Sequence, residues 1–506
     1  MTQPPLLLTD EQMRQFIAHG YLILQTDFPA EFHESMSRQI AEVMTKEGNP
    51  GNNILPRVPE VQEVFRHPTI RGALTSVLGP DYIMHPHRHC HFTLPGRKTQ
   101  SWHKDSYWGH AKVRNHHQWW AMIFYYNHAV DEELGPSGLM PGTQYYNNRT
   151  GDETEQDIHM QGQAGTFALI HYDLWHRGGA NLSADRTRSM LKFQFVRMAR
   201  PVGPTWDHTG TGWRALNGDG PPNQHESIWQ HQWQWLGGND TAPRLQSTNG
   251  TVGTYIDALT NPDKQQRLRA ADRLGLLGDA AGDAIPALAG ALADEYEPVA
   301  LNAAYALAGM GAPAIDALVT ALESEQKDVV RNAAYGLAAL GSAAVNALTE
   351  RLNHSAEQTR GYAAFALGEV GLADIADPQP AVAGLAQVVA DESEWVRRNG
   401  VEALGTLGIK NQPATERAAV EALCNGLRDG DGQVRFTSAL SLTRLGPESA
   451  VAVPALQQAL HDENRYVRAN AVDALKRIDT DEAKAVLIDY LLASRWCPST
   501  TPDSTF

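Results

Sequence analysis

The arrangement of apolar and polar residues changes character near residue 255. Before this point, short apolar runs alternate with polar residues and with many Gly and Pro turns, in a stretch that is rich in tryptophan and holds nearly all the histidines. This pattern predicts a mixed, strand-rich domain. After residue 255, segments rich in alanine and leucine follow a helical period. The chain is therefore expected to contain two modules of different fold class.

The second half of the chain repeats itself. Seven blocks, from "QRLRAADRLGLLG" to "VRANAVDALKRID", align so that one leucine stands at the same place in each. These leucines are Leu274, Leu307, Leu337, Leu367, Leu404, Leu442 and Leu475. Neighbouring leucines are 33, 30, 30, 37, 38 and 33 residues apart. A period of this size predicts an all-α solenoid, in which each helical pair buries its apolar face against its neighbours.

Each repeat also carries signals for helix starts and ends. Six of the seven blocks end in glycine, as expected just after a helix C-terminus. Five residues before each block stand side chains that mostly can accept a hydrogen bond from the free N–H groups of a helix. They are Asn261, Asp294, Ser324, His354, Asp391, Asp429 and Asp462.

The first half predicts helices and strands in alternation. "LTDEQMRQFIAHGYLIL" is typical of a helix, with Thr9 or Asp10 as its cap, followed by a strand. Residues 67–92 predict a helix that ends at Gly79-Pro80 and then another strand. The alternation in "SWHKDSYW", residues 101–108, also favours a strand.

Length, charge and cysteine content narrow the function classes. With 506 residues, the chain is long enough for two or more domains with separate cores, and its formal charge of −16 argues against a broad nucleic-acid-binding surface. Its three cysteines, Cys90, Cys424 and Cys497, are too widely spaced for a disulfide framework. The N-terminus lacks the pattern of a signal peptide, and no apolar run is long enough to span a membrane. We expect a soluble cytoplasmic protein.

One short motif carries candidate metal chemistry. On a strand, residues two apart point to the same side, so His103 and Asp105 would converge on one point. An imidazole and a carboxylate are two of the three ligands that hold non-haem Fe(II) in 2-His-1-carboxylate sites. The third ligand would be a histidine from elsewhere in the chain. Most His-x-Asp triplets lie on the surface or in a hydrogen-bonded core, so the motif alone does not establish a metal site.

Two resemblances extend this hypothesis. The order of "SWHKDSYW", "LGPSGLMPGTQYYN" and "DLWHRGGANLSADRTRSMLKFQF" resembles the phytanoyl-CoA dioxygenase family. That family implies an Fe(II)- and 2-oxoglutarate-dependent oxygenase on a double-stranded β-helix, a jelly-roll or cupin-like fold, with flanking helices. The repeats resemble HEAT repeats of the phycobilisome-lyase-like type. Together they imply a catalytic domain at 1–200, a connecting segment at 201–257, a solenoid of about seven repeats at 258–495 and a tail at 496–506.

The oxygenase resemblance assigns roles to individual residues. His103 and Asp105 match the proximal metal ligands, and His176 in "LWHRGGAN" matches the distal ligand. Arg188 matches the arginine that binds the far carboxylate of 2-oxoglutarate, and Arg186 is the alternative. A guanidinium suits this role because it can form two parallel hydrogen bonds to one carboxylate. Both arginines could instead form salt bridges on the surface.

A rival triplet lies in the same segment. His171 and Asp173 also have His-x-Asp spacing, just upstream of His176. If these two were the ligands, His103 would be an ordinary buried histidine. The order His-x-Asp, long gap, His favours the first assignment because it is the order found in the family.

Two further features of the first half stay open. His85, His87, His89 and His91 alternate along the strand expected before the motif, and they could bind a metal, line a substrate pocket or belong to an ordinary sheet. Trp102, Trp108, Trp119, Trp120 and Trp175 are expected in the core or in a pocket wall. Residues 201–255 hold five tryptophans among Gly, Pro and Asn, and are expected to pack between the two modules or over the active-site mouth.

The resemblance implies hydroxylation of a small-molecule or carrier-bound substrate, with Fe(II) as cofactor, 2-oxoglutarate and O2 as cosubstrates, and succinate and CO2 as products. The carboxylate at Asp105 argues against halogenation, because related halogenases have a small residue there. Desaturation and ring closure share the same ligands and stay open. The alternative is a degenerate oxygenase fold that serves, with the HEAT array, as a protein-binding scaffold. In either case the array could bind a protein partner.

Overall fold

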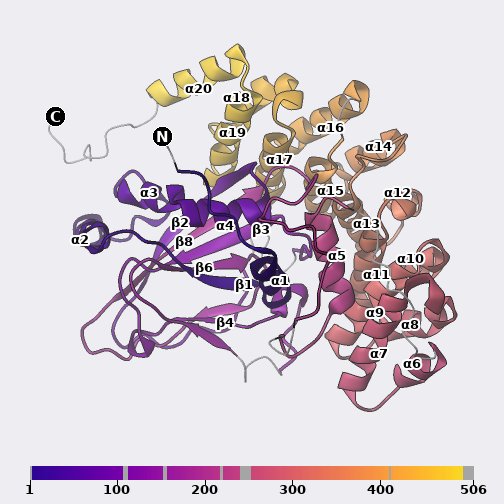
Figure 1. The fold of residues 1–506 in the computed structure, drawn as a ribbon. Coiled ribbons are helices and arrows are strands. Elements are labelled where there is room, and N and C mark those ends of the chain that lie inside the picture. Colours follow the sequence, from indigo (N-terminus) through magenta and orange to yellow (C-terminus); the bar gives the residue numbers. More distant parts are fainter. Residues whose placement is uncertain are drawn as a thin grey trace.

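The computed structural model describes residues 3–105, 112–151, 157–216, 220–239, 252–409 and 412–493. Figure 1 shows the strands of the first half gathered on one side, with the helices of the second half curving around them in a continuous array. Within these residues, no helix is both long enough and apolar enough to cross a membrane.

Two antiparallel sheets form the core of the first half. The larger sheet has the order β1 (Tyr21–Gln25), β6 (Thr166–His171), β3 (Trp120–Tyr125), β8 (Arg188–Arg197) and β2 (Tyr82–Thr93). The smaller sheet has the order β5 (Ile158–Met160), β4 (Ser137–Leu139) and β7 (His176–Gly178). Every residue of β3, β6 and β8 is buried, because the larger sheet is covered on both faces. The predicted double-stranded β-helix is confirmed.

Four helices flank the larger sheet, as Figure 1 shows: α1 (Asp10–His19), α2 (Ala30–Glu47), α3 (Glu60–Arg66) and α4 (Pro68–Leu78). Thr9 is the cap of α1 and forms a capping box with Gln12. Helix α4 ends before Gly79, whose φ of 77° requires a residue without a Cβ atom. The helix start at Thr9 and the helix end at Gly79 are both confirmed.

The strand predicted for residues 101–108 is wrong for the part that the structure describes. Residues 101–105 are irregular, apart from a single antiparallel bridge between His103 and His176. Residues 106–108, including Trp108, lie outside the described residues. The bridge extends the smaller sheet by one residue pair.

The second half consists of helices that pack in pairs. Their bounds are α6 (Val252–Ala258), α7 (Lys264–Leu277), α8 (Ile285–Ala291), α9 (Glu297–Gly309), α10 (Ile315–Leu322), α11 (Lys327–Leu340), α12 (Val345–Arg351), α13 (Glu357–Val370), α14 (Gln379–Val388), α15 (Glu394–Thr406), α16 (Pro413–Gly426), α17 (Gly432–Leu445), α18 (Val453–Ala459), α19 (Arg465–Ile478) and α20 (Asp481–Ala493). The seven aligned leucines are all buried and lie on the odd-numbered helices from α7 to α19. These odd-numbered helices contact one another in succession, which confirms the solenoid.

Short 3-10 helices join several of these elements. They are η1 (Gly51–Asn53), η3 (Glu132–Leu134), η4 (Thr143–Tyr145), η6 (Gly278–Ala284), η7 (Ala312–Ala314), η8 (Gly341–Ala344) and η9 (Gly446–Ala452).

The backbone conformation at the end of the blocks explains why six of them end in glycine. All six glycines have positive φ, between 56° and 73°. The seventh block ends in Asp479, whose φ of 59° makes it the one non-glycine residue with positive φ in the described part of the chain. Positive φ at this position, rather than the glycine itself, is thus common to all seven repeats, although ψ is 15° at Asp479 and −135° at Gly278.

The acceptor side chains five residues before each block act differently from our expectation. They accept the N–H of the residue two positions later, as in the 2.9 Å bond from Ser393 N to Asp391 Oδ1. The helix caps themselves are other residues, such as Ser393 at the start of α15. Asp391 also pairs with Arg360 of the preceding repeat at 2.6 Å, so these acceptors link neighbouring repeats. The same pairing recurs at Arg267–Asp294, Arg397–Asp429 and Arg435–Asp462.

Helix α5 (Glu226–Leu236) lies between the two halves of the chain. Trp235 packs edge-on against Trp119 of the first half at 5.6 Å between ring centroids. On its other side, Ser227 N and Oγ both donate to Asp272 on α7, at 3.0 Å each. This part of the connecting segment therefore packs between the modules. The module limits at residues 200, 257 and 495 stay predictions, and the tail at 496–506 lies outside the described residues.

Candidate metal centre

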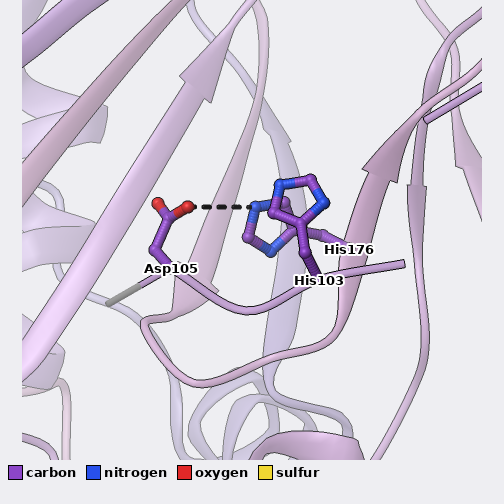
Figure 2. Close-up of side chains that lie close together, drawn as sticks. All are labelled: His103, Asp105 and His176. Carbon is purple, nitrogen blue, oxygen red and sulfur yellow. Dashed lines mark ion pairs between the residues drawn. The ribbon is translucent and has the colours of Figure 1, made fainter. Parts of the chain in front are cut away.

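Three side chains from two separate parts of the sequence meet beside β7. His103 and Asp105 come from the irregular segment beside β7, and His176 begins β7 itself. One potential ligand atom from each lies within 4.8 Å of the other two. Figure 2 shows the carboxylate of Asp105 facing the two rings, with Oδ1 3.7 Å from Nε2 of His176. Within the described residues, this is the one group of three that could hold a metal ion.

The backbone around the two histidines selects which ring nitrogen is available. The bridge between the two segments holds His103 and His176 through reciprocal N–H···O bonds of 3.0 Å each. In both rings Nδ1 contacts a backbone carbonyl two residues earlier, Ser101 at 2.9 Å and Leu174 at 3.0 Å. An Nδ1–H that donates to a carbonyl leaves Nε2 with its lone pair free, as a metal ligand requires. Nε2 of His176 is buried and has no hydrogen-bond partner.

Two side chains of β8 hold the carboxylate of Asp105 at one of its oxygens. Lys192 Nζ lies 2.6 Å from Oδ2, and Gln194 Nε2 donates to the same oxygen at 3.0 Å. Burial by itself would raise the pKa of Asp105, but the positive charge of Lys192 holds it well below its usual value. The carboxylate is thus ionised, and Oδ1 is the oxygen that faces His176.

A cavity of about 80 Å³ opens beside these side chains. His103 and His176 line it, together with apolar groups on Phe124 and Met190. Arg188 also lines the cavity and is buried, with Nη1 donating to the Gly135 carbonyl and Nη2 to Thr93 Oγ1 at 2.8 Å. Burial lowers the pKa of Arg188.

Arg186 has a different environment. Its guanidinium is exposed and pairs with Asp131 at 3.0 Å and with Glu133 on the surface. The structure therefore brings only one of the two candidate arginines, Arg188, into the cavity.

The rival triplet has another role. Asp173 is buried and accepts a hydrogen bond from Arg114 Nη1 at 2.9 Å. His171 uses Nδ1 to accept the N–H of Asp173, and burial lowers its pKa to about 4. Neither residue belongs to the metal-competent group found in the described residues. The geometry supports the first assignment over the rival.

The histidines of β2 divide between two environments. A bulge between Met84 and Arg88 interrupts the pairing with β8. His85 stacks on Tyr466 of α19 at 5.8 Å between ring centroids, and His87 Nδ1 lies 2.9 Å from the Tyr466 hydroxyl. His91 lines the cavity, and burial, reinforced by the charge of Lys192, lowers its pKa to about 2. One of the four thus lies where a substrate could touch it.

Of the predicted tryptophans that the structure describes, two lie in the core and none lines the cavity. Trp119 and Trp120 are buried in the core. The guanidinium of Arg177, which lines the cavity, lies over the ring of Trp102, 4.2 Å from the ring centroid. Lys104 Nζ lies over the ring of Trp175, 5.5 Å from the ring centroid.

Sequence reasoning missed Lys192 and Gln194. Both lie on β8 and point to the same face as Arg188, because residues two apart on a strand share a face. The alternation Arg188, Met190, Lys192, Gln194 could have indicated that four side chains of this strand face the site. What it could not indicate is that Lys192 reaches Asp105, 87 positions earlier in the chain.

Comparison with known families agrees with both resemblances. Residues 10–190 match the family described as phytanoyl-CoA dioxygenase. Residues 254–339 and 420–496 match HEAT repeats, and residues 329–354 match the PBS lyase HEAT-like repeat. The two-module interpretation of the sequence is confirmed. A search of curated proteins finds no match to this sequence.

Three solved structures resemble part of the chain. EvdMO1 has 15% identity and a TM-score of 0.31, covering 37% of this chain and 49% of its own, so this chain spans about half the length of EvdMO1. The non-heme alpha-ketoglutarate-dependent carbocyclase SnoK from nogalamycin biosynthesis has 17% identity and a TM-score of 0.33, covering 44% of this chain and 98% of its own. The non-heme monooxygenase ThoJ, in complex with nickel, has 14% identity and a TM-score of 0.30, covering 44% and 94%.

Proposed function

We propose that this chain, which joins a phytanoyl-CoA dioxygenase domain to HEAT repeats, is an Fe(II)- and 2-oxoglutarate-dependent dioxygenase. The observation that carries the proposal is the convergence of His103, Asp105 and His176 beside the buried guanidinium of Arg188. The most direct reaction for this set is hydroxylation of a small-molecule or carrier-bound substrate.

The donor set suits Fe(II). Two imidazoles and one carboxylate on one side of an ion leave positions open on the other side. The buried, unbonded Nε2 of His176 and the ionised Oδ1 of Asp105 are the kind of lone pairs that a cation would satisfy. Fe(II) bound by these residues would activate O2, with 2-oxoglutarate converted to succinate and CO2 as the substrate is oxidised.

The other residues of the cavity position the cosubstrate and hold the carboxylate ligand. Arg188 would bind the far carboxylate of 2-oxoglutarate through a charge-assisted pair in a partly dry pocket. Lys192 and Gln194 both bind Oδ2 of Asp105, which leaves Oδ1 as the oxygen that meets the metal. Phe124 and Met190 exclude water from one wall of the cavity.

The alternative is a degenerate oxygenase that serves as a binding scaffold. The complete set of ligand atoms within 4.8 Å of one another, with an arginine in the cavity, favours an enzyme. Measured iron and 2-oxoglutarate binding would separate the two hypotheses.

The proposal is tested by metal binding and turnover in single variants. His103→Ala, Asp105→Ala and His176→Ala should each abolish 2-oxoglutarate-dependent succinate formation and weaken Fe(II) binding by at least about a hundredfold, since each removes one of three ligands. The matched variant is His171→Ala, which alters the rival triplet and should keep iron binding. If His171→Ala loses iron binding while His103→Ala keeps it, the ligand assignment is wrong.

A further inference from the structure

The cavity beside the metal centre has an unusual charge for this protein. Five of its lining side chains are cationic, and none of the lining residues is Asp or Glu. They are Arg97, Lys98, Arg177, Arg188 and Lys192. The whole chain, in contrast, carries a formal charge of −16.

Two of the five charges are already neutralised within the protein. Lys192 pairs with Asp105 at 2.6 Å, and Arg177 pairs with Asp157 at 2.9 Å. Fe(II) and the 2-oxoglutarate dianion would cancel each other. Arg188, Arg97 and Lys98 then still carry positive charge at the loaded site.

Arg97 and Lys98 are the cations that cosubstrate binding does not require. Both are exposed, and neither has an ion pair with any residue that the structure describes. They lie on the segment after β2, at the edge of the cavity where Phe92 and Gly178 also line it. Clustered cations at the mouth of a cleft attract anions and orient them as they enter.

We propose that the substrate carries an anionic group, a carboxylate or a phosphate, and that Arg97 and Lys98 bind it at the cavity mouth. This inference rests on the proposed function and names its substrate class. The apolar side chains of Phe92, Phe124 and Met190 would contact the remainder of the substrate.

The test compares anionic and neutral probes on the full chain loaded with Mn(II) and saturating 2-oxoglutarate under anaerobic conditions. Hexanoate and hexyl phosphate are the anionic probes, and hexanamide and hexanol are their neutral counterparts. We expect the anions to bind about five- to tenfold more tightly, since two partly exposed ion pairs form. Arg97→Gln combined with Lys98→Gln should remove this preference and leave 2-oxoglutarate affinity within about twofold. Arg38→Gln combined with Lys46→Gln, on the exposed face of α2, is the matched control and should change nothing.

The outcomes separate the inference from the proposed function. Equal binding of anionic and neutral probes, no binding of either anion, or a preference that survives the double variant would overturn the inference. The proposed function would still stand if 2-oxoglutarate binds to the metal-loaded protein. Failure of 2-oxoglutarate binding would overturn both.

A second inference comes from a different part of the molecule, residues 112–119, which we term the linking segment. Every residue of this segment is buried, although none belongs to a helix or strand. It lies between the metal centre and the helix array, and its polar groups are bound by successive repeats.

Four consecutive repeats contact the linking segment. Tyr305 on α9 meets His116 Nδ1 at 2.9 Å, and Tyr335 on α11 donates to the Arg114 carbonyl at 3.1 Å. Glu369 on α13 accepts from Asn115 at 2.8 Å and from Trp119 at 3.0 Å. Glu402 on α15 lies 3.6 Å from Lys112 Nζ.

Arg114 connects this segment to the metal ligands. Its Nη1 donates to the backbone carbonyl of Asp105 and to Asp173 Oδ1, both at 2.9 Å. Asp173 stands three residues before His176, so Arg114 joins the two chain segments that carry the ligands. Arg114 is itself buried, which makes these charge-assisted bonds strong and directional.

We infer that the HEAT array positions the metal ligands through the linking segment, with Tyr335 and Glu369 as positioning residues. This inference rests on the proposed metal site. Groups that orient metal ligands typically change metal affinity by about 10- to 100-fold when removed. A single remote hydrogen bond is expected to contribute less than that.

The test measures Mn(II) affinity and thermal unfolding of the full chain. Tyr335→Phe, which removes only the hydroxyl that binds the Arg114 carbonyl, should weaken Mn(II) binding by about three- to tenfold. Glu369→Gln should weaken it as well. Tyr362→Phe is the control, because Tyr362 is buried in the same array against Trp395. A merely structural role would lower the unfolding temperature and leave the affinity of the folded protein unchanged.

Unchanged Mn(II) affinity in both variants would overturn this inference and leave the metal centre intact. Absence of Mn(II) binding by the unaltered chain would overturn the proposed metal centre, and this inference with it.

Discussion

Arg186 and Arg188 are separated by a single residue, yet their surroundings differ completely. Arg186 is exposed and paired with carboxylates, whereas Arg188 is buried with its guanidinium in the cavity. The difference follows from the start of β8 at Arg188, since a strand fixes which side chains point inward. Burial, rather than residue type, thus distinguishes the two candidates.

This contrast yields a prediction at the residue scale. Arg188→Ala should weaken 2-oxoglutarate binding by about 2–5 kcal/mol, because a buried charge would lose its partner. Arg186→Ala should leave 2-oxoglutarate binding unchanged, because this guanidinium is exposed and paired with surface carboxylates. Its loss should lower the free energy of unfolding by at most about 1 kcal/mol. Titration of each Mn(II)-loaded variant with 2-oxoglutarate provides the measurement. A normal response in Arg188→Ala with a lost response in Arg186→Ala would transfer the role to Arg186.

At the scale of elements, the contact between α5 and α7 contains a buried carboxylate. Asp272 accepts hydrogen bonds from Ser227 N and Oγ, and burial raises its pKa from 3.8 to about 7. The folded state therefore holds the proton of Asp272 more tightly than the unfolded state does. Its contribution to stability is full below about pH 4 and is lost as the pH rises towards 7.

Asp272→Asn should remove this pH dependence while keeping an oxygen that accepts from Ser227. The free energy of unfolding of the variant, relative to that of the unaltered chain, should be about 2–3 kcal/mol higher at pH 8 than at pH 5. The reason is that the carboxylate of Asp272 must ionise while buried, whereas an amide does not ionise. Thermal unfolding at the two pH values measures the difference. Asp316→Asn, at an exposed site on α10, is the control and should show none. A difference that shrinks with rising pH would contradict the prediction.

At the scale of the whole molecule, the array and the β-rich half share one interior. The odd-numbered helices face the sheets, as the contacts of Tyr305, Tyr335 and Glu369 with residues 112–119 illustrate. At the far end of the array, Arg477 pairs with Asp81 through both guanidinium nitrogens, at 2.6 and 2.8 Å. The inner surface that solenoids commonly offer to partners is here occupied by the same chain. A protein partner would have to bind elsewhere on the array.

Separating the halves should therefore destabilise both. Residues 1–251 expressed alone should aggregate, because Trp119 and other side chains buried against the array would be exposed. Residues 252–506 alone should lose part of their stability, although each repeat keeps its contacts with its neighbours. Coexpression of the two pieces should yield a stable complex that binds Mn(II) like the intact chain, as measured by copurification and metal titration. A soluble first half with full metal affinity would show that the array is dispensable.

Much of this protein can be predicted from local sequence signals. The helix cap at Thr9 and the helix end at Gly79 depend on contacts within a few residues, so they are visible in the sequence. The solenoid is visible because its apolar pattern recurs in seven blocks. The three candidate ligands, which the structure brings together, could also be proposed from the motifs and their order. At Asp479 the residue type alone would mislead, because the positive φ persists where the glycine does not.

Other features were decided only by the tertiary structure. Lys192 reaches Asp105 across 87 positions, and the linking segment is bound by repeats some 190 to 290 residues away. No periodicity records such contacts, because they depend on how sheets and helices pack after each has formed. The irregular backbone at residues 101–105 is held by its bridge to His176 rather than by strand propensity. The sequence by itself thus determined the two modules and the candidate ligands, whereas packing decided which arginine enters the cavity and which groups orient the ligands.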